Sequence, residues 1–137
     1  MNDDEARQVL AQGWMNKAEA ALAAAKRDFA AGDMGLAVNR IYYACFYAAS
    51  AVLLAEKRQF SKHAGVRAAV HQHLVNTQRL GTQWGQFYDQ AFEDRQEADY
   101  QALGEFDEAR VLDRIGLAVE FVNEMRRLLA ENPSPEG

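Results

Sequence analysis

The chain has 137 residues, 49% of them hydrophobic, which is enough for one domain with a core of its own. A formal net charge of −5 argues against a protein that coats nucleic acid non-specifically. Such binding needs many Lys and Arg contacts with phosphate, although a local basic cleft is still allowed. Cys45 is the single cysteine, which excludes an intrachain disulfide and a cysteine-based zinc site.

The first predicted element is a helix that starts after an N-cap at Asp3 or Asp4 and ends at Ala31. Gly32 is expected to end this helix, because glycine adopts the left-handed conformation without steric cost. Asp33 is expected to cap the helix that follows. The predicted apolar face of the first helix contains Val9, Leu10, Met15, Leu22, Ala25 and Phe29.

The second predicted helix, about 33–57, is apolar on every side instead of along one stripe, so it should be buried on every side. Small residues at 44, 45 and 48–51 would let another helix come close. A homodimer interface would cover what a small chain leaves exposed; the alternative is the central helix of a monomeric bundle. The large side chains around this helix are those of Ile41, Tyr42, Tyr43, Phe46, Tyr47, Val52, Leu53 and Leu54.

Three further helices complete the pattern, and each has a plausible start and stop signal. They are expected over about 62–79, about 83–101, and from the cap Asp107 to Glu131. Ser61 is the expected cap of the first of these, and Gly81 and Gly104 are the expected breaks. Their predicted inward residues are Val66, Val70, Leu74 and Val75, then Trp84, Tyr88 and Phe92, then Val111, Ile115, Ala118, Val119, Val122, Met125 and Leu129.

Both prolines lie in the tail, and no alternating strand pattern occurs. The sequence therefore predicts an all-α fold, an antiparallel helical bundle of about five helices with short connections. Residues 1–131 are predicted to form a single domain, and the polar tail 132–137 is predicted to be disordered.

Arg95 and Asp99 are charged residues at positions where an apolar face is expected. Arg95 follows Phe92 by three residues and Asp99 follows Arg95 by four, so helical spacing places both on or beside the stripe that faces the core. An exposed pair at this spacing contributes only a few tenths of a kcal/mol, which does not explain its place on the apolar side. We therefore consider a structural ion pair and a ligand-binding role as alternatives.

Other polar residues lie at similar positions. Asn39 and Arg40 begin the apolar part of the second helix, and Lys62 and His63 occupy the first turn of the third. Positive side chains with free backbone N–H groups at a helix start suit a phosphate. The alternative is a solvated turn without a role.

Metal and cofactor sites are not indicated. His71 and His73, two residues apart, should point to different sides of a helix, and both are expected to be ordinary surface positions. No metal-ligand motif, glycine-rich phosphate loop or nucleophile elbow is present. The N-terminus is acidic and unlike a signal peptide, and no apolar run is expected to reach membrane-spanning length. We therefore expect a soluble cytoplasmic protein with no metal, no cofactor and no membrane.

Three segments together resemble the signature of HEPN-domain proteins: residues 39–46 (NRIYYACF), 62–66 (KHAGV) and 95–100 (RQEADY). Residues 118–122 (AVEFV) fit the last helix of the same family. The nearest branch is a group of small proteins with an arginine…Ala-Asp-Tyr motif. The resemblance spans roughly residues 10–130.

The resemblance implies an all-α bundle that dimerises, so that the arginine motifs of two protomers meet in a cleft. Many HEPN proteins resemble metal-independent ribonucleases, and some are toxins paired with a minimal nucleotidyltransferase. In active members the arginine is followed by a histidine after four to six intervening residues. The arginine would hold the scissile phosphate and the histidine would move protons.

This chain departs from that pattern, because Tyr100 stands where the histidine is expected and residues 101–107 contain no histidine. Tyrosine titrates near pH 10 and is a poor base at neutral pH. Asp99 is a weak base if Arg95 stabilises its charged form. In toxin members a tyrosine beyond the histidine can accept a nucleotidyl group, a role that Tyr100 could serve.

The leading interpretation is a HEPN-family homodimer that works with a minimal nucleotidyltransferase and binds RNA or a nucleotide in the dimer cleft. Arg95 would hold phosphate, Asp99 would orient Arg95, and Tyr100 would offer a hydroxyl or a stacking surface. A metal-independent ribonuclease toxin and a non-catalytic structural subunit are the alternatives. The expected secondary ligand contacts are Asn39, Arg40, Tyr43, Lys62 and His63.

Overall fold

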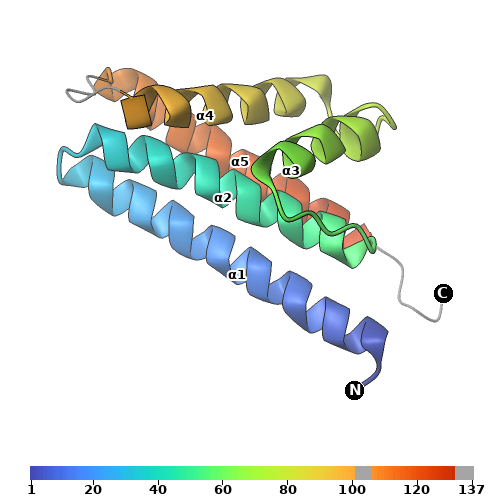
Figure 1. The fold of residues 1–137 in the computed structure, drawn as a ribbon. Helices are drawn as coiled ribbons and strands as arrows, with labels where there is room; N and C mark the ends of the chain where they lie inside the picture. The colour runs from blue at the N-terminus through green and yellow to red at the C-terminus, as the bar shows by residue number, and fades with distance from the viewer. Residues whose placement is uncertain (101–105, 132–137) are drawn as a thin grey trace.

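A computed structural model describes residues 1–100 and 106–131, and these residues form helices and no strand (Figure 1). The all-α prediction is confirmed. The predicted break at Gly104 and the predicted disordered tail lie outside the described residues. The elements are α1 (Asp3–Ala30), α2 (Met34–Ala55), α3 (His63–Ala69), a π-helical segment η1 (Val70–Val75), α4 (Thr82–Tyr100) and α5 (Glu108–Glu131).

Two adjacent residues, Gly32 and Asp33, form the turn between α1 and α2. Gly32 has a φ of +82°, in the region that glycine favours, and the Asp33 carboxylate accepts a hydrogen bond from the Leu36 N–H at 3.1 Å. Both predictions are confirmed. The predicted N-cap of α1 is wrong by one residue or two, because the side chain of Asn2 accepts the hydrogen bond from Glu5 N–H at 2.8 Å.

The buried face of α1 differs from the predicted one at its start. Val9 and Leu10 are 57% and 59% exposed, whereas Ala11, Met15 and Ala18 are buried. Successive helical residues are turned by about 100° from one another, so residues 9 and 10 fall outside the line through 11, 15 and 18. The first turns of α1 also lie farther from α2 than its last turns do (Figure 1).

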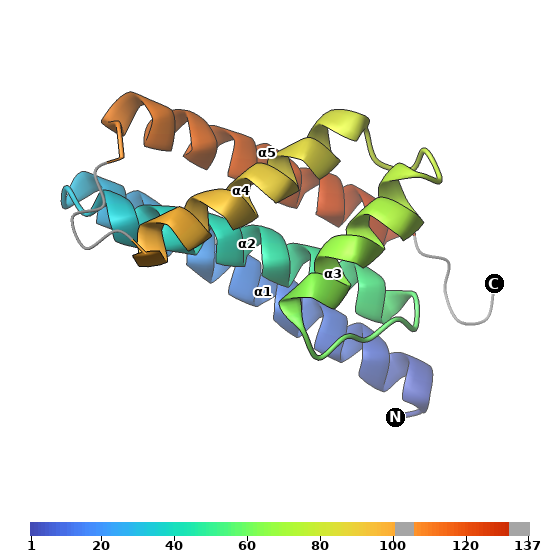
Figure 2. The same cartoon turned by 45° about the horizontal axis from the view of Figure 1, so that its top comes forward.

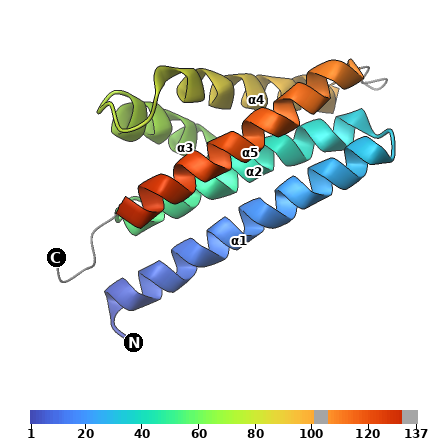
Figure 3. The same ribbon diagram turned by 180° about the vertical axis from the view of Figure 1, so that it is seen from behind.

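Helix α2 lies at the centre of the bundle and contacts α1, α3, α4 and α5. Figure 2 shows α3 and α4 across one side of it, and Figure 3, from behind, shows α5 across the other. Twelve of its 22 residues are buried within this one chain. Its small residues are fully buried and let the neighbouring helices of the same chain approach: Ala44, Cys45, Ala48, Ala49 and Ala51.

One described helix, α2, is long and apolar enough to cross a membrane by length and composition alone. The expectation that no apolar run reaches spanning length is therefore wrong. In the structure 61% of that stretch is buried inside the bundle, which is the environment of a core helix.

The predicted third helix changes from α-helical to π-helical hydrogen bonding partway along and ends at Val75. Regular α3 covers only His63–Ala69 and is followed by η1, whose wider hydrogen bonding includes Asn76 N–H to His71 O at 2.8 Å. Lys62, not Ser61, is the N-cap, and no side chain among the described residues caps the helix start. The regular α-helix at the expected phosphate site is therefore only 7 residues long.

Helices α4 and α5 agree closely with their predicted ranges. Asp107 accepts a hydrogen bond from Ala109 N–H at 3.3 Å, as expected of the α5 cap. Helix α5 buries Val111, Ile115 and Ala118, together with Phe121 and Leu128, against the rest of the bundle. Helix α4 brings its apolar face, with Arg95 beside it, over α2 close to the start of α3.

Candidate functional site

Side chains from three elements form one cluster, which we call the Arg95 cluster: Arg95 of α4, Tyr42, Tyr43 and Phe46 of α2, and His63 at the start of α3. The guanidinium carbon of Arg95 lies 5.3 Å from the ring centre of Tyr42 and 5.2 Å from that of Tyr43. At this range a cation is attracted to both ring faces. The Tyr42 hydroxyl and Nδ1 of His63 are 2.7 Å apart.

Helical spacing explains how the cluster assembles. Tyr42, Tyr43 and Phe46 follow one another by one and three residues, so neighbouring parts of α2 present all three rings. On α4, Phe92 lies three residues before Arg95, and its ring is 5.7 Å from that of Tyr42. The packing of Phe92 on Tyr42 therefore holds this face of α4, including Arg95, against α2.

Arg95 is held without being fully paired. Its side chain is 23% exposed, and its Nε is buried and has no hydrogen-bond partner among the described residues. The nearest carboxylate oxygen, Oδ2 of Asp99, is 3.6 Å away, and the Asp99 side chain is 52% exposed. The expected ion pair exists, but at this length Asp99 does not form a hydrogen bond with Nε of Arg95.

The environment fixes the protonation states of Tyr42 and His63. Burial raises the pKa of Tyr42 to about 12, so its hydroxyl keeps its proton at neutral pH. Burial, and then the positive charge of Arg95, lower the pKa of His63 below its usual 6.5. The imidazole of His63 is therefore neutral at pH 7, and it stacks on Phe46 with ring centres 4.3 Å apart.

The structure brings together some of the sequence-predicted site residues. Arg95, Asp99, Tyr43 and His63 meet in or beside the Arg95 cluster. Asn39 is half-buried one helical turn before Tyr43.

Three others are exposed to solvent. Tyr100, the last residue of α4, is 89% exposed. The Arg40 guanidinium lies 3.9 Å from Asp28 of α1, and Lys62 is an exposed N-cap. These three stay predictions as ligand contacts, and the geometry does not add to them.

Arg67 and Phe92 are site neighbours that sequence reasoning did not assign. The guanidinium of Arg67 lies 4.6 Å from the ring centre of Phe92, and its Nε donates to Asp89 Oδ1 at 2.8 Å. The available signal was spacing, because Arg67 follows His63 by four residues and so shares its side of α3. A second guanidinium thus lies close to the Arg95 cluster.

Asp94 was also missed, although it directly precedes Arg95. It is the buried acidic residue of α4, 4% exposed, and accepts hydrogen bonds from Gln90, Arg110 and Arg114. Arg110 and Arg114 are four residues apart on α5, a spacing that presents both to one partner. Asp94 therefore ties the end of α4 to α5 while Arg95 points to α2.

His71 is not the ordinary surface residue that was expected. Its Nε2 lies 3.0 Å from Asp89 Oδ1, the same oxygen that Arg67 contacts. Burial alone would raise the pKa of Asp89, but the hydrogen bonds from His71 and Arg67 outweigh it and lower that pKa. In the part of the chain that the structure describes, no three His, Cys, Asp or Glu side chains gather as metal ligands would.

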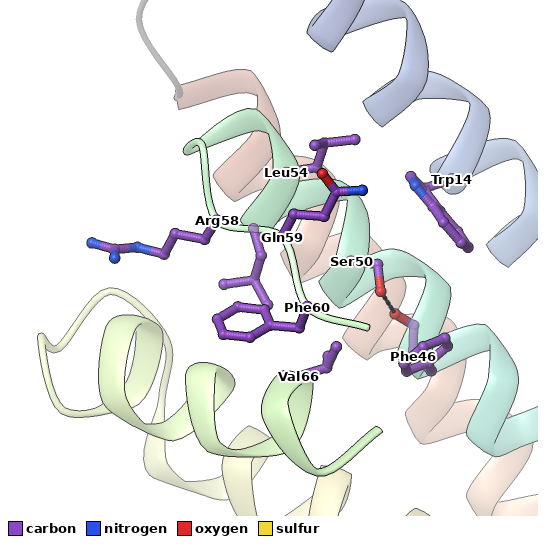
Figure 4. A pocket seen from close by; sticks show the side chains of 9 residues that line it. Trp14, Phe46, Ser50, Leu54, Arg58, Gln59, Phe60 and Val66 are labelled. Atoms are coloured by element: carbon purple, nitrogen blue, oxygen red, sulfur yellow. Dashed lines mark hydrogen bonds between the residues drawn. The ribbon is translucent and has the colours of Figure 1, made fainter. Parts of the chain in front are cut away.

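A small pocket of about 60 Å³ adjoins the Arg95 cluster and shares Phe46 with it. It lies between α1, α2, α3 and the segment 58–60, and Trp14, Phe60 and Val66 line it (Figure 4). The Ser50 hydroxyl is already used, because it donates to Phe46 O at 2.7 Å, and Arg58 extends away from Trp14 in this view. The pocket is therefore mainly apolar, and the polar chemistry lies in the Arg95 cluster.

Comparisons with known proteins agree on one family. The model of the HEPN domain matches residues 11–128. A UPF0332 protein of Thermotoga maritima is 39% identical over 131 residues, which is 96% of this chain and 97% of that protein. The putative toxin MJ0142 of Methanocaldococcus jannaschii is 32% identical over 117 residues, which is 84% of this chain and 78% of that protein.

Proposed function

This chain belongs to the HEPN family, and from that premise we propose that its Arg95 cluster binds a phosphate of RNA or of a nucleotide. The observation that carries the proposal is the buried Nε of Arg95, which has no hydrogen-bond partner among residues 1–100 and 106–131. The guanidinium is held beside two tyrosine rings, with the Asp99 carboxylate 3.6 Å from Nε. Buried polar groups normally have partners, so an unused arginine donor favours a ligand. A guanidinium suits phosphate oxygens because its donors form a planar fork.

The same proposal includes the partners that the resemblance implies. We propose a cytoplasmic homodimer in which two Arg95 clusters face one cleft, acting with a minimal nucleotidyltransferase in a toxin–antitoxin type of pair. The toxin part is supported by the similarity to a protein that is itself named a putative toxin. The exposure of Tyr100 supports its role as an acceptor of a nucleotidyl group, because a modifying enzyme needs access to the hydroxyl.

The binding proposal is tested with Arg95→Ala and with Arg27→Ala as the matched control, an exposed arginine near the end of α1. Fluorescence anisotropy with a labelled single-stranded RNA and with ATP measures binding by each protein. We expect Arg95→Ala to bind at least about tenfold more weakly, since a charge-assisted hydrogen bond contributes about 1.5–3 kcal/mol. Equal binding by wild type and Arg95→Ala, or binding by neither, contradicts the site.

The partner proposal has a separate test. Incubating the protein with a minimal nucleotidyltransferase and ATP should add the mass of one nucleotidyl group to the wild type and none to Tyr100→Phe. A structural role for the arginine predicts instead that Arg95→Ala changes the oligomeric mass and leaves ligand binding untouched. Light scattering on the same variants separates this alternative from a binding site.

A further inference from the structure

The segment that follows α2 carries three exposed cations without a carboxylate partner. Residues 57–62 are all exposed, and Lys57, Arg58 and Lys62 form no ion pair with the residues that the structure describes. Every other arginine except Arg27 has a carboxylate partner. The sequence has no Asp or Glu from position 57 to position 88, so no acidic neighbour along the chain offsets these charges.

An apolar surface borders these cations. The ring of Phe60 is 39% exposed and lines the small pocket together with Trp14 (Figure 4). Leu10 is 59% exposed and precedes Trp14 by four residues, so both lie on the same side of α1. Val9 beside it is 57% exposed. Large apolar side chains grouped on a surface are typical of an interface.

The start of α1 presents the complementary charge. Asp3 and Glu5 lie in its first turn, are exposed, and form no ion pair within residues 1–100 and 106–131. Figure 1 shows the start of α1 and the segment after α2 at the same end of the molecule, with α1 directed away from α2 there. This end therefore carries acidic and basic groups that do not pair with one another within the chain.

We propose that the start of α1 in one protomer docks on segment 57–62 of a second copy of this chain, and that the reverse contact forms at the same time. In a pair related by a twofold axis, each copy gives one acidic surface and receives one, so the interface closes on a dimer. The inference rests on the proposed homodimer and names the surface through which it forms.

Spacing along the chain allows the polar and the apolar contacts to form together. Glu5 and Leu10 are about 7.5 Å apart along the axis of α1. Arg58 and Phe60 are two residues apart, which is at most about 7 Å of extended chain. Leu10 of one copy can therefore reach Phe60 and the pocket while Glu5 lies at Arg58. The apolar contact would supply affinity, and the charges would fix the register.

The apolar part of this surface favours protein over nucleic acid as its occupant. Three cations alone would also suit phosphates. A phosphate backbone does not bury aliphatic side chains such as Val9 and Leu10, whereas an apolar protein surface does.

Reversing the charges in two matched variants tests the surface. One variant carries Lys57→Glu and Arg58→Glu, and the other carries Asp3→Lys and Glu5→Lys. We expect the wild type to be a dimer and each variant alone to have a dimer dissociation constant at least about a hundredfold higher, since like charges then face each other. An equimolar mixture of the two should regain the dimer, because both contacts are then complementary. Native mass spectrometry should find one chain of each kind in it.

Two controls separate this surface from the rest of the molecule. Lys26→Glu with Arg27→Glu reverses two exposed cations near the end of α1 and should leave the dimer unchanged. Leu10→Asp should weaken the dimer by a similar factor, whereas Leu112→Asp, at a similarly exposed leucine of α5, should not. Far-ultraviolet circular dichroism checks that each variant keeps its helices.

The outcomes distinguish this surface from the proposed homodimer. If the wild type and the Lys57→Glu, Arg58→Glu variant are both dimers, the surface is wrong and the homodimer stands. A mixture of the two charge-reversed variants that stays monomeric also overturns the surface. The same holds if reversal at 57 and 58 abolishes RNA binding without changing the mass, since these cations would then serve RNA. A monomeric wild type overturns the proposed homodimer itself.

Discussion

His63 links stability to pH because its surroundings disfavour its charged form. Its pKa in the folded protein is lowered by burial and by Arg95, whereas the unfolded chain restores a value of about 6.5. Between those two values the unfolded state binds more protons, so the free energy of unfolding rises with pH there. Asp89, whose folded pKa is also lowered, contributes stability that is lost only below about pH 4.

The wild type should therefore melt at lower temperature as the pH falls from about 7.5 to about 5.5. The decrease should be smaller in His63→Gln, which keeps a polar side chain but cannot charge, and unchanged in His73→Gln. Thermal melts followed by circular dichroism at several pH values measure the slopes. Equal slopes for wild type and His63→Gln would contradict the lowered pKa.

Asp94 is the residue whose loss should cost the most stability among the acidic residues of α4. Its side chain is 6% exposed and accepts from Arg110 and Arg114, so Asp94→Ala leaves two cations without this carboxylate. Breaking a buried pair costs about 3–5 kcal/mol, and the partial exposure of both arginines reduces this to about 2 kcal/mol. Asp113→Ala is the matched control, because Asp113 also meets Arg114 but is 64% exposed.

Urea unfolding measures the effect of each substitution on the free energy of unfolding. A change below about 0.5 kcal/mol is expected for Asp113→Ala, as for most exposed pairs. If Asp94→Ala behaves like this control, Asp94 does not hold α4 to α5.

At the scale of elements, α4 approaches η1 closely at Gly85. A Cβ added there would lie 2.9 Å from Cε1 of His71 and 3.0 Å from Cγ2 of Val75. Gly85→Ala should therefore destabilise the fold by about 1–3 kcal/mol through overpacking. Gly13→Ala in α1 is the control, since nothing lies within 4 Å of its added Cβ, and it should stabilise by up to about 1 kcal/mol.

The two glycine variants are compared by their urea midpoints. An increase in stability for Gly85→Ala would show that η1 and α4 separate at little cost.

Helix ends that depend on nearby side chains were predictable from the sequence, as Gly32, Asp33 and Asp107 show. The interruption of the third helix by η1 was not, because it is a change of hydrogen-bond register within an unbroken apolar pattern. The exposure of Val9 and Leu10 depends on the direction in which α1 leaves α2, which no local signal contains.

The candidate site also has some features that the local sequence predicts and others that depend on tertiary packing. Arg95 was recognisable because a charge on an apolar stripe is a local anomaly, and His63 was marked as a polar residue at a helix start. Their meeting depends on how α3 and α4 cross α2, a property of tertiary packing. Tyr42 and Phe46 read as core residues in the sequence, and their second role as the surface behind Arg95 and His63 needed the structure.

At the scale of the whole molecule, the chain covers its own apolar centre. All four other α-helices contact α2, so a second protomer is not needed to bury it. The homodimer that the family resemblance implies would therefore form through the outer surfaces of the helical bundle. We expect light scattering to give twice the mass of the 15.4 kDa chain at micromolar concentration, and a monomer mass would contradict the dimer.

In the part of the chain that the structure describes, Nε of Arg95 has no hydrogen-bond partner, and this has a consequence for the evolution of this protein. A buried donor without a partner costs about 1–3 kcal/mol, so selection for stability alone would favour an apolar side chain there. Arg95→Met should then melt no lower than wild type, while RNA should raise the melting temperature of the wild type only. Arg95 would then lower the folding stability of the ligand-free protein, and ligand binding would restore that stability.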